Sequence, residues 1–294
     1  MHCHSLLARA LFCGWIIPIG ALAFAAPPEQ QPATIVIDDT PLTVAQTMQH
    51  DAALADLCFV DRTTGWAVGD RGVIWRTTDG GQSWQQQESG VTCRLHSVSF
   101  IDHTHVWAAG GTFEPYTHAT RAVLLTPSDG GATWTQLPQQ TLPLVSHVTF
   151  FDAKHGMAAG VGSAAEPSGV SATRDGGRTW EPLSADARGV WLAADFLDAT
   201  TAAFAGPAGQ FAALARRRVA HGPNALALTR SYRALQLAPP TGGWLVGDGG
   251  LVMTTHDLGH SWQTPPGELP PVAREHFDFH AVATVGSSVW IGGS

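Results

Sequence analysis

The chain has 294 residues, of which 44% are hydrophobic and only 14% are charged, and it contains 32 glycines and 11 tryptophans. This composition is typical of a folded protein with many tight turns and excludes a disordered chain. The formal net charge is −8 at pH 7 and the only basic block is Arg216–Arg218, so we expect no nucleic-acid partner.

The N-terminal residues have the features of a secretory signal. Arg9 supplies a positive charge, the stretch 10–24 is largely apolar, and Ala23-Phe24-Ala25 provides the small residues of a cleavage site. Residues 1–26 are therefore predicted to be a signal peptide, and the protein is predicted to be periplasmic or extracellular. A retained membrane anchor is the alternative, which Pro18 and the shortness of the apolar run disfavour.

Cleavage would leave Cys58 and Cys93 as the only cysteines of the mature chain. An oxidising compartment permits a disulfide between them. Because Cys58 falls well along one predicted strand and Cys93 falls before the next, we expect the two residues to be too far apart to pair. The segment 27–50 precedes the main domain and contains a possible ring-closing strand at 34–37.

Four segments repeat the pattern (Ser/Thr)-x-Asp-x-Gly-x-(Ser/Thr)-Trp, with Pro127 replacing the first hydroxyl residue of the second copy. The first three copies follow one another at the length of a propeller blade, about 40–50 residues, and the last gap spans about two blades. One blade has therefore lost its box. The aspartate, glycine and tryptophan of the copies are Asp79, Gly81 and Trp84; Asp129, Gly131 and Trp134; Asp175, Gly177 and Trp180; and Asp257, Gly259 and Trp262.

This Asp-box pattern is typical of a tight hairpin turn. The aspartate accepts hydrogen bonds from turn amides, the glycine adopts a positive φ, and the tryptophan ring packs against the blade. A single aspartate could be a catalytic acid, but four in the same turn context indicate one repeated structural requirement. We predict that none of the four aspartates is catalytic.

Short apolar strands recur around each box and are separated by glycine turns, which predicts an all-β chain. Inner strands are expected at 54–61, 95–102, 145–152, 190–197, 232–237 and 279–284, and a second strand follows each, at 65–69, 106–110, 156–160, 203–206, 243–247 and 289–292. The sequence therefore predicts a β-propeller of four-stranded blades over residues 51–294. The blade boundaries are about 51–89, 90–139, 140–186, 187–228, 229–267 and, for an incomplete sixth blade, 268–294. We expect a seven-bladed parent protein of which this chain is the N-terminal part.

The fourth unit is the one without a box, and its third strand runs directly into Arg216–Arg218. Two interpretations remain open. The arginines could bind an acidic partner, or they could form a solvated replacement for the lost turn.

The combination of Gly-Trp-Ala-Val-Gly at 65–69, the Gly-x-x-Gly hairpin at 69–72 and the repeated boxes resembles the photosystem II stability and assembly factor family and its relatives in non-photosynthetic bacteria. The resemblance covers roughly residues 54 to 294. It implies a seven-bladed propeller that scaffolds or chaperones protein partners outside the cytoplasm, without a cofactor. The fourth blade departs from the pattern, and nothing in the sequence indicates photosynthesis, so a photosystem partner is not carried over.

An Asp box alone also occurs in sialidases and xyloglucan hydrolases, so a glycoside hydrolase is the alternative function. A sialidase-like site needs a tyrosine paired with a glutamate, yet Tyr232 has no obvious partner and Tyr116 has only Glu114 two residues away. A carboxylate pair across a cleft cannot be placed either. We therefore predict a non-catalytic protein.

The 14 histidines raise the question of a metal site. The pairs His103 and His105, His256 and His260, and His276 and His280 have suggestive spacings. Because most of these residues fall in turns or at variable box positions, we predict exposed turn residues and no metal.

The loops that join second to third strands are short in three blades, but blade two inserts 111–121 and blade three inserts 161–169. Two extended loops on one face of a rigid scaffold favour a binding face there. Tyr116 is the best anchor candidate, with Arg121 near it.

Alignment of the inner strands on Val98, Leu235 and Val282 places three further residues at one repeat position. These residues are His96, Arg233 and His280, near the start of their strands. We hypothesise that they surround the mouth of a central channel, receive an acidic segment or chain terminus of a protein partner, and bind it more strongly as the pH falls toward about 6. The alternative is that they are unrelated polar residues where the inner strands meet solvent.

Overall fold

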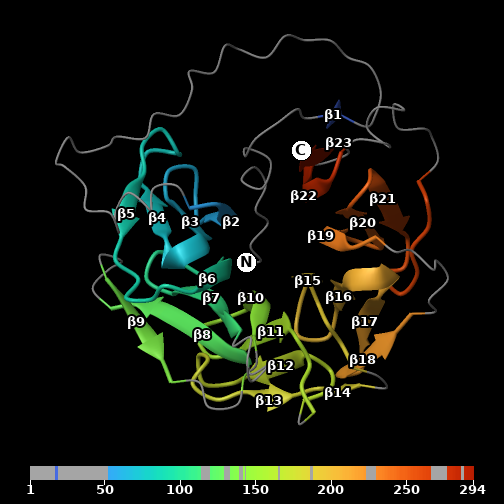
Figure 1. The fold of residues 1–294 in the computed structure, drawn as a ribbon, viewed down its shortest axis with the longest axis horizontal. Helices are drawn as coiled ribbons and strands as arrows, with labels where there is room; N and C mark the ends of the chain where they lie inside the picture. The colour runs from blue at the N-terminus through green and yellow to red at the C-terminus, as the bar shows by residue number, and fades with distance from the viewer. Residues whose placement is uncertain are drawn as a thin grey trace.

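The computed structural model describes residues 17–18, 52–113, 120–128, 133–138, 142, 144–164, 166–185, 188–222, 230–265, 277–285 and 288–294. These residues form small sheets arranged like blades around a common centre, and the first strand of each blade lies nearest that centre (Figure 1). The prediction of an all-β propeller is confirmed.

The first three blades are regular four-stranded antiparallel sheets. Blade one contains β2 (Leu54–Phe59), β3 (Gly65–Gly69), β4 (Ile74–Thr77) and β5 (Gln85–Gln87); blade two contains β6 (Arg94–Phe100), β7 (Val106–Phe113), β8 (Thr120–Pro127) and β9 (Trp134–Leu137); blade three contains β10 (Val145–Phe150), β11 (Gly156–Gly160), β12 (Val170–Thr173) and β13 (Glu181–Pro182).

Blade four carries an additional outer strand, because β14 (Ser184–Ala185) pairs in parallel with β18. In blade five, Gln263 forms an isolated antiparallel β-bridge with Thr254, in the place where the other blades have a fourth strand. Blade four contains β15 (Ala193–Phe196), β16 (Ala202–Ala205), β17 (Phe211–Ala215) and β18 (Arg218–His221); blade five contains β19 (Tyr232–Ala238), β20 (Gly242–Gly247) and β21 (Leu251–Thr255); the sixth unit contains β22 (Phe279–Val285) and β23 (Ser288–Gly293), and β1 (Ile17–Pro18) pairs with β23.

The hydrophobic core lies between adjacent blades. Trp66 of blade one is fully buried against Leu95 and Val98 of blade two, and Trp107 of blade two stacks on Phe150 of blade three with ring centroids 3.8 Å apart. Similar clusters join blades three and four, four and five, and five and six. Because a sheet buries its apolar faces only against its neighbours, each blade depends on the next one for its stability.

Polar side chains of the inner strands also join each blade to the next. The Asp56 carboxylate accepts a hydrogen bond from the Val98 amide at 3.0 Å, and Asp195 accepts one from the Leu237 amide at 2.8 Å. Ser146, Ser99 and Gln236 make corresponding bonds to Trp191, Phe150 and Thr284. These bonds satisfy amides and carbonyls at the edges of the sheets, where the first strands have no further strand beside them, and they help to fix the relative position of the blades.

Cys58 and Cys93 are free thiols. Within the described residues, no helix has the length and hydropathy of a membrane span. The predicted strand at 34–37 and nearly all of the predicted signal peptide lie outside the described residues.

Candidate functional site

The inner strands share an irregularity at their first residues. The pairing register shifts between Leu95 and Ser97 in blade two, so His96 is left unpaired as a bulge. The same shift leaves Ala55, Ser146, Arg233 and His280 unpaired in blades one, three, five and six. In blade four, Leu192 occupies the corresponding position just before β15, where its amide donates to the Ala205 carbonyl.

The glycine at the end of each second strand explains the bulges. A Cβ atom on Gly110 would collide with the Arg94 carbonyl oxygen, and one on Gly247 would collide with the Ser231 carbonyl oxygen. The chain that enters the inner strand therefore passes directly over these glycines, which leaves an extra residue before the ladder resumes. That residue turns its side chain toward the channel instead of into the pleat.

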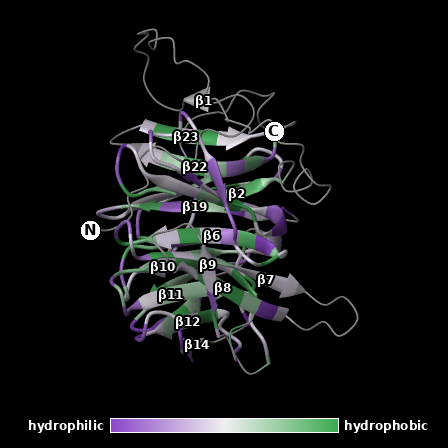
Figure 2. Cartoon of the chain, turned by 90° about the vertical axis from the view of Figure 1, so that its left-hand side faces the viewer, coloured by the Kyte–Doolittle hydropathy of each residue, from purple (hydrophilic) through white to green (hydrophobic). Residues whose placement is uncertain are grey.

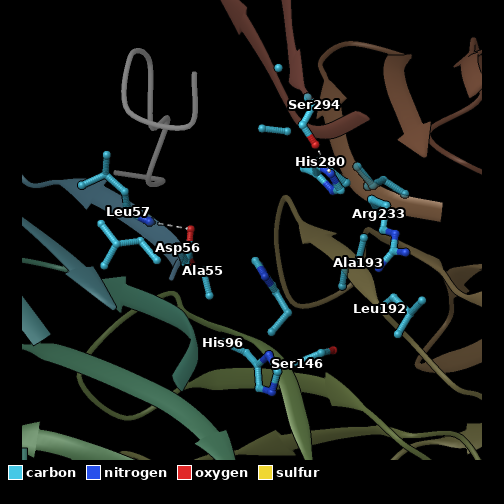
Figure 3. A pocket seen from close by; sticks show the side chains of 18 residues that line it. Ala55, Asp56, Leu57, His96, Ser146, Leu192, Ala193, Arg233, His280 and Ser294 are labelled. Carbon is cyan, nitrogen blue, oxygen red and sulfur yellow. Dashed lines mark hydrogen bonds between the residues drawn. The ribbon is translucent and has the colours of Figure 1, made fainter. Parts of the chain in front are cut away.

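The five bulge residues and Leu192 all line one cavity of about 360 Å³ at the centre of the ring. Figure 3 shows Arg233 and His280 side by side, with His96 and Ser146 across the opening from them. The structure thus brings together the three residues that the alignment placed at one repeat position. Arg121 lies exposed on β8 and is not among the cavity-lining residues, and Tyr116 lies outside the described residues.

Arg233 is the strongest positive group at the channel mouth, and it is engaged by Asp248. Its Nε and NH2 atoms donate to the two Asp248 carboxylate oxygens at 2.7 and 3.2 Å. This forked bond raises the pKa of Arg233 and lowers the pKa of Asp248. The guanidinium is still exposed and has further N–H groups, so the pair holds Arg233 in place and leaves it able to bind an anion.

His96 is not a cationic residue. Burial, with a contribution from nearby Arg94, lowers the pKa of its imidazole to about 4. It stays neutral near pH 6, and the expectation that protonation of His96 strengthens binding at that pH is therefore wrong. His280 is exposed, and its Nε2 atom lies 3.4 Å from the Ser294 hydroxyl oxygen.

The channel mouth consequently has two unlike sides. Blades five and six contribute Arg233, which is positively charged, and His280, and both side chains can donate hydrogen bonds. Blades one, three and four contribute Ala55, Ser146 and Leu192, and the Leu192 side chain is 42% exposed although it is a large hydrophobic residue. A ligand that combines one anionic group with an apolar group would match both sides.

The two extended loops on this face prove to be different. In blade two, β7 and β8 continue as a ladder to the pair Phe113 and Thr120, and β7 extends past the neighbouring strands (Figure 2). In blade three, the loop is fixed against the entry to blade four: the Trp191 indole donates to the Ser168 carbonyl at 2.7 Å, and the Gly162 amide donates to Gly189 at 2.8 Å. This second loop therefore joins two blades instead of forming an adaptable binding loop.

The Asp boxes lie at the opposite ends of the strands. Asp175 accepts hydrogen bonds from the Thr179 amide at 2.9 Å, the Thr179 hydroxyl at 2.6 Å and the Thr173 hydroxyl at 2.9 Å. Asp79 and Asp257 make the matching bonds. The box glycines Gly81, Gly177 and Gly259 have φ angles of 89°, 88° and 87°.

The box tryptophans that are described lie against the blades. The Trp180 indole donates to the Gly177 carbonyl at 3.1 Å, and Trp134 donates to Gln87 of blade one at 3.0 Å. Trp84 packs edge-on against Phe59, and Trp262 packs against the core between blades four and five. Asp129 and Gly131 lie outside the described residues.

In blade four, a two-residue hairpin replaces the lost box. Ala215 pairs with Arg218, and the intervening Arg216 and Arg217 have φ angles of 50° and 62°. Both residues are exposed and left-handed, which is the geometry of a type I′ turn. The arginines thus form the replacement turn.

Two of the histidines in turns pair with an aspartate of their own turn. His105 and His155 contact Asp102 and Asp152 at 2.9 and 2.8 Å. Within the described ranges, no three His, Cys, Asp or Glu side chains are grouped so that they could hold a metal ion.

Among the residues at this repeat position, sequence reasoning missed the other three that line the cavity, namely Ala55, Ser146 and Leu192. Their positions could have been found from the same strand alignment that identified His96. They were overlooked because small or apolar residues do not stand out as candidate ligands.

A comparison with protein families finds that the model of the family described as "Photosynthesis system II assembly factor YCF48" matches residues 40–191, slightly more than half of the chain. No curated protein matches the chain significantly.

Among solved structures, the fold is similar to "YCF48 bound to D1 peptide", with 20% identity, a TM-score of 0.52 and coverage of 83% of this chain and 90% of that one. It is also similar to YCF48 from Cyanidioschyzon merolae, with 17% identity, a TM-score of 0.52 and coverage of 83% and 94%. An ancestral GH74 enzyme shares 15% identity with a TM-score of 0.55, over 77% of this chain but only 34% of the enzyme. At these identities the likenesses show the fold alone.

Proposed function

Because the chain belongs to the photosynthesis system II assembly factor YCF48 family, we propose that it is an exported, non-catalytic propeller that binds a segment of a protein partner and acts as a scaffold or assembly factor. The channel mouth is the binding site in this proposal. The observation that carries it is the convergence of five bulge residues and the matching Leu192 on one cavity, with an exposed arginine on one side and an exposed leucine on the other.

A related propeller of the family has been solved with a bound peptide, which supports a peptide ligand here. The side chains at the channel mouth indicate which class of peptide would bind. Arg233 and His280 would bind a carboxylate, either an acidic side chain or a chain terminus, while Leu192 would contact an apolar residue beside it. The partner is therefore proposed to present a carboxylate next to an apolar side chain in an extended segment.

Replacement of Arg233 and His280 provides the test. We expect a pull-down from envelope extract with the Arg233→Ala and His280→Ala double variant to recover at least about tenfold less partner than wild type, since a hydrogen bond to a charged group contributes about 1.5–3 kcal/mol. Arg217→Ala is the matched control, because it removes an exposed arginine from the opposite face. Equal recovery by the double variant would refute the channel-mouth site.

A further inference from the structure

Glu166 has a carboxyl group that is buried in the long loop of blade three. We call residues 161–169 the blade-three loop; the structure describes all of them except residue 165. Glu166 is only 7% exposed, and within the described residues the one hydrogen bond that reaches its carboxylate comes from the Ser171 hydroxyl, at 3.4 Å. Because an ionised carboxylate loses its hydration when it is buried, one long hydrogen bond compensates little of that cost. Burial therefore raises the pKa of Glu166, and the Ser171 hydroxyl offsets only part of this effect.

The strands that flank the loop offer no charge to compensate for this burial. β11 and β12 consist of uncharged residues. Two groups that carry or can gain charge pack nearby: Arg188 donates its Nε to the Gly162 carbonyl at 2.9 Å, and the His221 ring centroid lies 5.3 Å from that of Trp191. The raised pKa of Glu166 comes from burial and not from either of them. A proton is therefore the species that neutralises this carboxyl group.

The backbone around Glu166 fixes the loop against the next blade. The Glu166 amide donates to the Ser163 hydroxyl, and the Ser163 amide donates to the Glu166 carbonyl, both at 3.0 Å. On either side of this turn, the Gly162 amide donates to the Gly189 carbonyl and the Gly189 amide donates to the Pro167 carbonyl, both at 2.8 Å. The Glu166 side chain cannot leave its buried position without disturbing the turn that these bonds hold.

The blade-three loop also supports the apolar side of the channel mouth. The Ser168 carbonyl accepts a hydrogen bond from the Trp191 indole, and the Trp191 carbonyl accepts one from the Ser146 hydroxyl, both at 2.7 Å. Ser146 and Leu192, the residue that follows Trp191, both line the channel mouth (Figure 3). A displacement of the loop would therefore reach two residues of the mouth.

We propose that Glu166 is a pH-dependent latch, whose protonated form holds the blade-three loop against the entry to blade four and whose ionisation loosens the loop and the apolar side of the channel mouth. The stabilisation is complete below the ordinary glutamate pKa of 4.5 and is lost as the pH rises through the raised pKa of the seated loop. This dependence is opposite in sign to that of Asp175, whose pKa is lowered in the folded chain. The latch itself does not depend on the proposed function, and only its effect on partner binding rests on it.

Hydrogen exchange of the whole chain measures the latch. It is followed by mass spectrometry on peptides that cover residues 160–171 and is corrected for the intrinsic pH dependence of amide exchange. In the wild type we expect several-fold lower protection of this segment at pH 7 than at pH 4, because the ionised carboxyl group favours local opening. Glu166→Gln should be as protected at pH 7 as at pH 4, since a side-chain amide of the same shape does not ionise. Glu181→Gln is the matched control, because it removes an exposed glutamate of the same blade and should retain the wild-type pH dependence.

Equal protection of the wild-type segment at both pH values would overturn the latch. A pH dependence that survives in Glu166→Gln and disappears in His221→Asn would also overturn it, because the imidazole would then be the titrating group. A carbon-13 NMR titration of the wild-type Glu166 carboxyl group needs no variant. Its midpoint should lie above 4.5, and a midpoint at or below that value would refute the proposal.

The effect on the channel mouth is tested by the pull-down. At pH 7, Glu166→Gln should recover several-fold more partner than wild type, because its loop stays seated. Equal recovery, in a pull-down where the Arg233→Ala and His280→Ala double variant loses the partner, would overturn the link between the loop and the mouth. The exchange and NMR measurements use no partner, so a failure of the channel-mouth site leaves their result unaffected.

Discussion

At the level of single residues, the Asp-box carboxylates act as hydrogen-bond acceptors at the centre of a turn. Asp175 receives bonds from two amides and two hydroxyls, namely those of Arg178, Thr179 and Thr173. A turn amide that loses its acceptor costs free energy of the order of 1–3 kcal/mol. The box aspartate therefore matters for folding at a site far from the channel mouth.

We predict that Asp175→Ala lowers the free energy of unfolding by about 1–3 kcal/mol. Urea unfolding followed by circular dichroism would measure it. Glu181→Ala is the control, because Glu181 is an exposed residue of the same blade whose nearest cation, Arg174, is 3.6 Å away. An unchanged midpoint for Asp175→Ala would contradict the role given to the box.

Which residues face the channel could be predicted from the sequence, because His96, Arg233 and His280 occupy one position of a repeat whose geometry recurs. The pKa values and ion pairs of these residues could not be predicted from the sequence. The low pKa of His96 depends on burial by neighbouring blades, and the engagement of Arg233 depends on Asp248, which the β19–β20 ladder brings beside it. Both effects come from tertiary contacts that residue type and spacing do not encode.

At the level of elements, the hairpin of blade four shows the cost of a missing box. Arg216 and Arg217 both adopt a positive φ, which is unfavourable for residues other than glycine and asparagine. Sequence inspection located the lost turn, but the turn type that replaced it was not predictable, since Arg-Arg carries no preference for a type I′ turn. The strand register, set by β17 and β18, imposes that geometry.

We expect Arg216→Asn combined with Arg217→Gly to raise the free energy of unfolding by about 1 kcal/mol, because Asn-Gly is the preferred type I′ pair. Thermal and urea unfolding of the double variant would measure the gain. Arg218→Ala, which removes the adjacent exposed arginine from β18 without altering the turn, should leave stability unchanged. A loss of stability in the double variant would show that the arginine side chains themselves stabilise this hairpin.

At the level of the whole molecule, the Asp boxes make the free energy of unfolding depend on pH. The Ser83 hydroxyl and amide lower the pKa of Asp79 from its ordinary value of 3.8 to about 2. At Asp175 and Asp257 burial opposes ionisation, yet the hydrogen bonds outweigh it and the pKa of each is also lowered. Because these carboxyls bind protons less readily in the folded chain than in the unfolded one, they stabilise the fold above pH 3.8 and lose that effect as the pH falls toward about 2.

The melting temperature should therefore fall between pH 5 and pH 2, with most of the loss below the ordinary carboxyl pKa. Asp79→Asn should lower the melting temperature at pH 5 and reduce the further drop toward pH 2, since the variant has one fewer group to protonate. Differential scanning calorimetry across this range would measure both effects. A melting temperature that does not change with pH would contradict the linkage.

The bulges at the head of the inner strands have a consequence for how such a protein can change its ligand. The bulge residues, and Leu192 at the matching position of blade four, project from backbone positions outside the ladder, and most of the packing between blades depends on other residues of the same strands. Ser146 is an exception, because its hydroxyl donates to the Trp191 carbonyl of the next blade. Substitution at the other five positions can therefore alter what the channel recognises at small cost to folding. A library that randomises Ala55, His96, Leu192, Arg233 and His280 would be a compact starting point for redesigned specificity, and lineages of this fold could diverge in partner by the same route.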